Sequence, residues 1–279
     1  MRRMKRRRSG LADSGAVAWS GGVAVAAACA VGYIALFGLP RLIPIDVKQW
    51  FPYFVLAAAA LGCLERGRSP TPVGQRRWAR AVAVRWLARA VFIGAVVTLS
   101  VWPRVVHAWS PPVATAWVAG LCIGMGLIWW SMSGIVSAGT ATEASTAFML
   151  VAAGSGIAVM ISGSASIGLL AAALAATLAM SVVLAFLGRG VGLFPSAVPV
   201  VVTVLVSVWI QGHHYSELPA SAAILLAVAL PVRGVIDRLP ALRRPHRGGL
   251  LLRLGLVGLA VIAAILLAWR ASPVDDYYY

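Results

Sequence analysis

The side chains best suited to chemistry are two adjacent histidines late in the sequence. His213 and His214 precede Glu217, and His107 lies far upstream. His213 and Glu217 are four residues apart, so a helix through both would turn an imidazole and a carboxylate toward one face. With His107 as a further ligand, the set predicts a divalent metal site, or a haem held by two histidines. However, Pro219 disfavours a helix that continues across Glu217. The Glu217 carboxylate would equally suit the first turn of the next helix.

A second region concentrates small polar residues within an apolar stretch: Gly154, Ser155, Gly156, Ser162 and Ser164. One interpretation is a broken helix whose freed backbone groups line a substrate path. The simpler interpretation is close packing, in which small residues allow neighbouring helices to touch. The Gly120 and Gly124 pair, which forms a GxxxG motif, receives the same packing interpretation.

Acidic residues are scarce, and Glu143 is the nearest to a buried carboxylate. It follows Thr140 by three residues, which predicts a capping box at a helix start. The alternative is a proton-coupling residue on the substrate path. The sequence contains no HExxH, GxSxG, Walker or paired-carboxylate motif, and the three cysteines have no CxxC spacing, so no known catalytic motif and no thiolate metal site is predicted.

A basic stretch over residues 75–89 alternates arginine with apolar residues at helical spacing. Tryptophans lie between its arginines, a pattern typical of a helix that rests on the membrane surface. We expect its cations to bind anionic lipid headgroups on the cytoplasmic side. These cations are Arg77, Arg80, Arg85 and Arg89. The alternative places Arg85 and Arg89 within the bilayer as a voltage sensor or an anionic-substrate site.

The elements that must position these residues are long apolar segments. The 279 residues are 61% hydrophobic and 11% charged, with a mean hydropathy of +0.88, which excludes an ordinary soluble domain. The net charge of +16 does not indicate nucleic acid, because the basic residues lie almost wholly between apolar runs. Nine runs approach the ~20 residues that a membrane-spanning helix needs. They cover Ala16–Leu39, Val47–Leu64, Ala90–Trp109, Val113–Ser133, Ala144–Ser162, Ala165–Leu187, Val191–Gln211, Pro219–Val235 and Leu250–Trp269.

The distribution of basic residues predicts the orientation of this all-α helix bundle. Only four of the 24 Lys and Arg fall in segments assigned to the outside, and the other 20 fall inside. We therefore expect a basic cytoplasmic tail over 1–15, one transmembrane domain over 16–269 and an external tail over 270–279. The first run also resembles a signal peptide, but its length favours a retained anchor. Nearly all of the eleven tryptophans fall near predicted span ends, at the level of the headgroups, with Trp129 expected at the inner side and Trp209 at the outer side.

Three functions fit this architecture. The leading hypothesis is a permease, a channel-type protein or a membrane-complex subunit that handles a small solute in a bacterial-type plasma membrane. The second is a membrane enzyme or redox subunit that uses the outer histidines with a divalent metal or haem. The third is a structural or assembly subunit held to other membrane subunits by its small-residue faces. No nucleic-acid partner is expected.

Overall fold

The computed structural model describes residues 21–64, 75–138, 141–187, 195–236 and 247–272, and every regular element within them is a helix. An N-terminal helix covers Gly21–Phe37. It is followed by η1 (Val47–Trp50), α2 (Phe51–Leu64), α3 (Gln75–His107), α4 (Pro111–Ala138), α5 (Ala141–Ile161), α6 (Ala165–Phe186), η3 (Pro195–Ala197), α7 (Val198–Tyr215), α8 (Ala220–Ile236) and α9 (Arg247–Arg270). The predicted tail over 1–15, residues 273–279 of the predicted tail over 270–279, and the cap residue Thr140 lie outside the described residues.

Seven of the described helices are long and apolar enough to cross a membrane. They cover Val47–Leu64, Val82–His107, Pro111–Val136, Thr142–Ile161, Ala165–Phe186, Pro195–Tyr215 and Leu251–Arg270. The segments Gly21–Phe37 and Ala220–Pro231 are apolar but shorter. The all-α class is confirmed for the described residues, and the composition of these helices is that of a multi-pass membrane protein. The count of nine spans stays a prediction.

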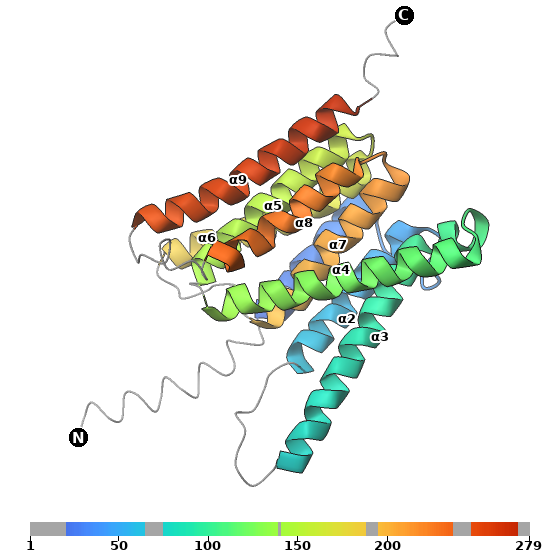
Figure 1. The fold of residues 1–279 in the computed structure, drawn as a ribbon, viewed down its shortest axis with the longest axis horizontal. Coiled ribbons are helices and arrows are strands. Elements are labelled where there is room, and N and C mark those ends of the chain that lie inside the picture. The colour runs from blue at the N-terminus through green and yellow to red at the C-terminus, as the bar shows by residue number, and fades with distance from the viewer. Residues whose placement is uncertain (1–20, 65–74, 139–140, 188–194, 237–246, 273–279) are drawn as a thin grey trace, which may run out of the picture.

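Helices α5, α6, α8 and α9 form one group within the fold, and Figure 1 shows the axes of α5, α8 and α9 lying nearly parallel, with α8 running opposite to α9. Helix α5 contacts both α6 and α9, and α8 also contacts α9. Helix α3 extends away from this group toward the lower part of the view (Figure 1). The start of α6 is capped locally, because the Ser164 hydroxyl accepts a hydrogen bond from the Ile167 amide at 3.4 Å.

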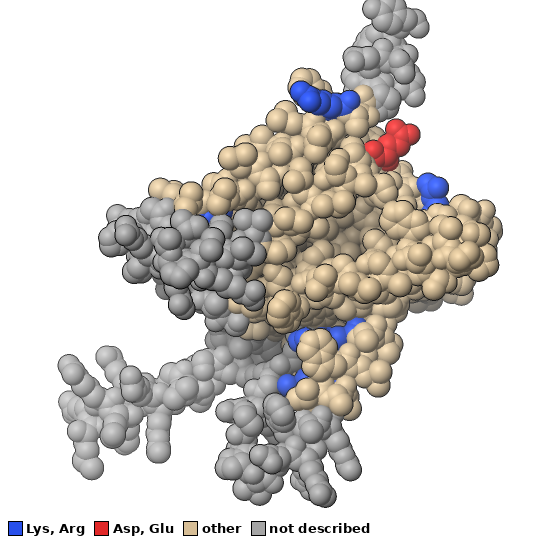
Figure 2. Space-filling model, viewed as in Figure 1, with Lys and Arg blue, Asp and Glu red and all other residues tan. Residues whose placement is uncertain are grey.

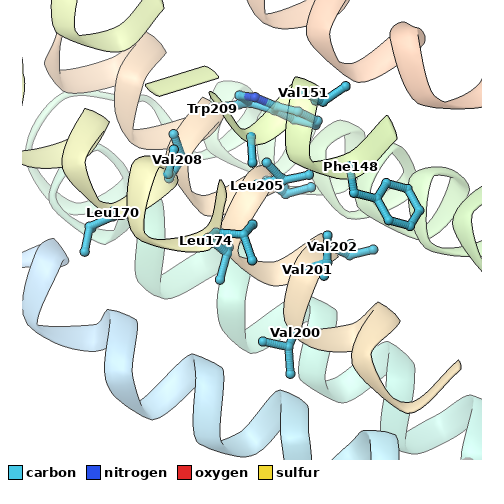
Figure 3. Packing of buried hydrophobic residues seen from close by; sticks show 14 of the residues in the cluster. Phe148, Val151, Leu170, Leu174, Val200, Val201, Val202, Leu205, Val208 and Trp209 are labelled. Atoms are coloured by element: carbon cyan, nitrogen blue, oxygen red, sulfur yellow. The ribbon is translucent and has the colours of Figure 1, made fainter. Parts of the chain in front are cut away.

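Helix α7 occupies the centre of the bundle. It contacts α2, α3, α4, α5, α6 and α8, and 89% of the residues in its most apolar stretch are buried. Figure 3 shows side chains of α5 and α6, such as Phe148 and Leu174, gathered around Leu205 and Trp209 of α7. A helix surrounded in this way must be apolar on every side unless its polar groups find partners inside the protein.

The N-terminal helix joins this core through a close approach of backbones. Cβ atoms added at Gly22 and Gly62 would both collide with the carbonyl oxygen of Ser196. The Ser196 hydroxyl also accepts a hydrogen bond from the Gly22 amide at 3.2 Å. Glycine at both positions therefore allows η3 to fit between the N-terminal helix and α2.

The segment over residues 75–89, which we expected to form an interfacial helix, is not a separate helix, and its position at the membrane surface stays a prediction. This segment is the first part of α3, which continues without a break from Gln75 to His107. A helix of 33 residues is ~50 Å long at 1.5 Å per residue, well beyond the ~30 Å hydrocarbon layer. Arginine and tryptophan at helical spacing are found in helices that lie along the membrane surface. They are also found where a spanning helix extends beyond the bilayer, so the pattern does not distinguish these two orientations.

Two tryptophans and one glycine pair also differ from expectation. Trp129 and Trp209 are only 2% and 5% exposed, so both point into the bundle and not toward a headgroup belt. Gly120 and Gly124 do not pack against another described part of the chain, because a Cβ atom added at either would meet nothing within 4 Å. Helix α4 therefore presents its GxxxG face outward.

Charged residues lie at the edges of the described surface. In Figure 2 the centre of the visible face is uncharged, and the blue and red side chains lie around its margin. Two polar contacts lie near one end of the bundle. The Lys48 ammonium donates to the Ser166 hydroxyl at 2.8 Å, and the Tyr53 hydroxyl donates to the carbonyl of Arg41 at 2.7 Å. This separation of charge from apolar surface is what a bilayer requires of a membrane protein.

Candidate functional site

The adjacent histidines lie at the C-terminal end of α7 among aromatic rings. His214 packs edge-on against Trp109 and Trp117, with ring centroids 5.3 and 5.5 Å away, and His213 lies 4.9 Å from His214. The Arg104 guanidinium donates to the backbone carbonyl of His214 at 2.6 Å. His213 Nδ1 makes a 2.8 Å hydrogen bond with the carbonyl of Leu218, the residue to which the turn after α7 returns. The histidine rings thus help to hold the junction of α3, α4 and α7.

The structure does not assemble the predicted metal-ligand set. Helix α7 ends at Tyr215, and Glu217 has a left-handed φ of 56°, so it does not share a helical face with His213. Glu217 is also outside the first turn of α8, which begins at Ala220. His107 is exposed at the end of α3. Among the described residues, no three His, Cys, Asp or Glu side chains come close enough to bind one metal ion.

The small polar residues of α5 lie in a packing interface. Helix α5 is continuous from Ala141 to Ile161, so it frees no backbone groups at its glycines. A Cβ atom at Gly156 would come within 3.0 Å of the carbonyl oxygen of Gly168 on α6, and one at Gly154 would collide with Val261 on α9. These contacts correspond to the packing interpretation of the sequence.

The hydroxyl groups in this region bond to neighbouring protein atoms. Ser155 donates to the Val151 carbonyl at 2.7 Å and accepts from the Trp209 indole nitrogen at 2.8 Å, which links α5 to α7. Ser162 donates to the Ala158 carbonyl at 2.8 Å. Ser155 therefore joins two helices, whereas the Ser162 hydroxyl bonds back to its own helix.

Glu143 forms an ion pair between two helices. Its carboxylate lies 3.4 Å from the guanidinium of Arg253 on α9, and the two side chains are only 9% and 17% exposed. Glu143 belongs to the first turn of α5, as expected for a carboxylate near a helix N-terminus. The pair anchors α9 to α5 at the end of the bundle that the arginine distribution assigns to the cytoplasm.

The predicted lipid-binding arginines are distributed along the first half of α3. The side chains of Arg77 and Arg80 lie outside the described residues, and Arg85 is half-buried. The guanidinium of Arg89 lies 5.1 Å from the Trp86 ring and 5.5 Å from the Trp129 ring. Arg89 is therefore held against the junction of α3 and α4 by two cation–π contacts.

A stripe of polar residues on α7 was not predicted from the sequence. Thr203, Ser207 and Gln211 follow one another at intervals of four residues and are each no more than 1% exposed. This spacing places them along one side of the helix over ~12 Å, at 1.5 Å per residue. At 100° per residue, Ser207 projects nearly opposite to Trp209, the residue that bonds to α5.

The side chains of this polar stripe have no internal partner in the part of the chain that the structure describes. The hydroxyls of Thr203 and Ser207, and both amide atoms of Gln211, are buried without a hydrogen bond to any described residue. Each such group costs about 1–3 kcal/mol relative to a bonded one. These three residues therefore lower the stability of the folded protein unless another molecule supplies the missing hydrogen bonds. The stripe is suited to bind a polar molecule within the bundle.

Two neighbouring helices carry polar atoms of the same kind. The Ser100 hydroxyl on α3 and the Trp129 indole nitrogen on α4 are also buried without a hydrogen bond to the described residues, and both helices contact α7. The backbone carbonyl of Ser100 accepts a hydrogen bond from Tyr215 at 3.3 Å, which places α3 beside the end of α7 that holds Gln211. The signal in the sequence was the four-residue spacing of Thr, Ser and Gln within an apolar run.

Comparisons with models of known protein families, with curated proteins and with solved structures found no match to this chain.

Proposed function

We propose that this protein is a permease- or channel-type membrane protein that conducts a small, uncharged, hydrogen-bonding solute along the polar stripe of α7. The observation that carries the proposal is the burial of Thr203, Ser207 and Gln211 in the most enclosed helix of the bundle, without hydrogen-bond partners among the described residues. Polar groups that are buried in a membrane protein without an internal partner are costly, and contact with a polar substrate would offset this cost.

The chemistry of the stripe selects the class of solute. Hydroxyl and amide groups both donate and accept hydrogen bonds but carry no charge, so they match alcohols, amides and water better than ions. Because Thr203, Ser207 and Gln211 are at most 1% exposed, we expect a solute as small as glycerol or urea. The ion pair of Glu143 with Arg253 links other helices, α5 and α9, and the stripe itself contains no charged residue.

The test is swelling of proteoliposomes in iso-osmotic glycerol or urea, followed by stopped-flow light scattering. We expect the wild-type protein to accelerate swelling over protein-free liposomes. We expect Gln211→Leu to reduce the protein-dependent swelling rate about tenfold. The solute loses its hydrogen bonds to Gln211 as it crosses the bundle, and this raises the barrier to its passage by roughly 1.4 kcal/mol.

Gln49→Leu is the matched control, because it makes the same substitution in a segment that precedes α2. There the Gln49 side chain accepts a hydrogen bond from the Ile45 amide at 2.9 Å, far from the stripe in sequence. Its swelling rate should equal that of the wild type. Wild-type liposomes that swell no faster than empty ones, or equal rates for Gln211→Leu and Gln49→Leu, would overturn the proposal.

We further propose that the chain crosses a bacterial-type plasma membrane nine times, with its N-terminus in the cytoplasm and its C-terminus outside. The excess of arginine in alternate connections supports this orientation, and the two shorter apolar helices, Gly21–Phe37 and Ala220–Pro231, supply the additional crossings. A reporter fused after Leu64 should be active inside the cell, and one fused after Tyr279 should be active outside. The reverse pattern would reject this topology.

A further inference from the structure

The outer surface of the bundle has a cleft between α3 and α4 that differs from the rest of the apolar exterior. Its volume is about 280 Å³, near the lower limit of ~300 Å³ for ligand pockets. Residues of both helices line it, including Trp86, Arg89, Ile93, Ile123, Gly126 and Trp130. We propose that this cleft is a specific binding site for an anionic phospholipid, with Arg89 as the residue that holds the headgroup phosphate.

The position of Arg89 supports a charged ligand. It is the single cation among the residues that line the cleft, which include no acid. The rings of Trp86 and Trp129 hold its guanidinium at 5.1 and 5.5 Å, and Trp129 in turn packs edge-on against Phe92 at 6.1 Å. A guanidinium held in place loses less conformational entropy when it binds a phosphate, and its planar donors match phosphate oxygens.

The remaining walls of the cleft suit a hydrocarbon chain. Ile123 and Trp130 are 63% and 61% exposed, so the cleft opens sideways toward the surroundings of the bundle. Gly126 leaves space in its wall, because a Cβ atom added there would meet nothing within 4 Å. Arg89 lies in the first half of α3, the half that the charge distribution assigns to the cytoplasmic side of the membrane, where the leaflet is rich in anionic lipid. The phosphate of a phospholipid would bind Arg89 while its hydrocarbon chain contacts the apolar walls of the cleft. A free phosphate would contact only Arg89.

The experiment compares lipids retained by the purified protein. The full chain is reconstituted in nanodiscs of equal phosphatidylglycerol and phosphatidylcholine, released gently, and examined by native mass spectrometry. We expect the wild type to retain phosphatidylglycerol in preference to phosphatidylcholine. Arg89→Gln should reduce bound phosphatidylglycerol about fivefold, the effect of ~1 kcal/mol for one cation near an anionic surface.

A second variant tests the cleft without altering charge. Gly126→Leu should fill the open space and reduce the retention of both lipids, and its Cβ atom meets no neighbour that would prevent folding. The matched controls are Arg270→Gln at the exposed end of α9 and Gly120→Leu on the open face of α4, which should retain lipid as the wild type does. Equal retention of the two lipids by the wild type, or equal retention by each variant and its control, would overturn the proposal.

Discussion

Helices α4 and α7 are both long and apolar, but they meet opposite environments. Only 17% of the residues in the most apolar stretch of α4 are buried, against 89% in α7. Ile123, Leu127 and Trp130 of α4 are exposed, whereas Thr203, Ser207 and Gln211 of α7 are fully buried. These polar residues of α7 are thus inside the bundle, whereas α4 exposes large apolar residues, the arrangement expected where lipid surrounds the fold.

A small or polar residue can therefore have different structural roles in different membrane helices. Glycine on α4 faces open space at positions 120, 124 and 126, and one of these spaces belongs to the proposed lipid cleft. Glycine on α5 and α6 instead lets two backbones touch. Likewise, Ser155 joins α5 to α7 through Trp209, while Ser207 has no partner among the described residues. Only the neighbours decide between packing, binding and lipid exposure.

The largest expected effect tests the difference between packed and open glycines. In Gly168→Ala, the new methyl group would lie 2.7 Å from the Gly156 carbonyl oxygen, a contact that requires α5 and α6 to separate. We expect this variant to lose about 2 kcal/mol of unfolding free energy through overpacking. The measurement is an SDS titration of the folded protein in mixed micelles, followed by tryptophan fluorescence.

Gly124→Ala makes the same change on the open face of α4, where the added atom meets nothing within 4 Å. There the substitution should leave stability unchanged or raise it by up to about 1 kcal/mol, because alanine favours a helix more than glycine does. Equal losses in the two variants would show that α4 is also packed, for example against a second protein.

The fold could be predicted from the sequence to the extent that hydrophobicity decides it. The predicted run Ala165–Leu187 coincides with α6, and the run Leu250–Trp269 falls within α9, because an uninterrupted apolar segment has few alternatives to a membrane-spanning helix. The sequence did not show that the basic segment over residues 75–89 continues into the next apolar helix, since the spacing of arginines does not record the direction of the helix axis. Trp129 and Trp209 were assigned to interfaces because their burial depends on neighbouring helices.

The candidate site depends more strongly on tertiary structure. The histidine motif was visible in the sequence, but the end of α7 at Tyr215 separates Glu217 from the ring of His213. The polar stripe was overlooked because a hydropathy average over α7 is dominated by its valines, and three polar residues at helical spacing become significant only when every side of the helix is enclosed. Arg89 was predicted to bind lipid, but the cleft beside it requires knowledge of how α3 and α4 pack.

The smallest expected effect concerns the polar stripe of α7, where we expect a substitution to raise the unfolding free energy and not to lower it. Thr203→Val replaces a buried hydroxyl that has no partner among the described residues by a methyl group of similar size. Removal of such a group should raise the unfolding free energy by about 1 kcal/mol in the same SDS titration. The swelling rate in glycerol should fall, because the solute loses one of its partners. A residue kept at a cost to stability is typical of a functional site.

Thr177→Val supplies the comparison on α6, where the threonine hydroxyl donates to the Ala173 carbonyl at 2.8 Å. This hydroxyl is already bonded, so its removal should bring no gain in stability and no change in swelling. If Thr203→Val instead lowers stability more than Thr177→Val does, the Thr203 hydroxyl stabilises the folded protein through a structural partner. The stripe would then belong to the architecture of α7, and conduction of a solute along it would lose its main support.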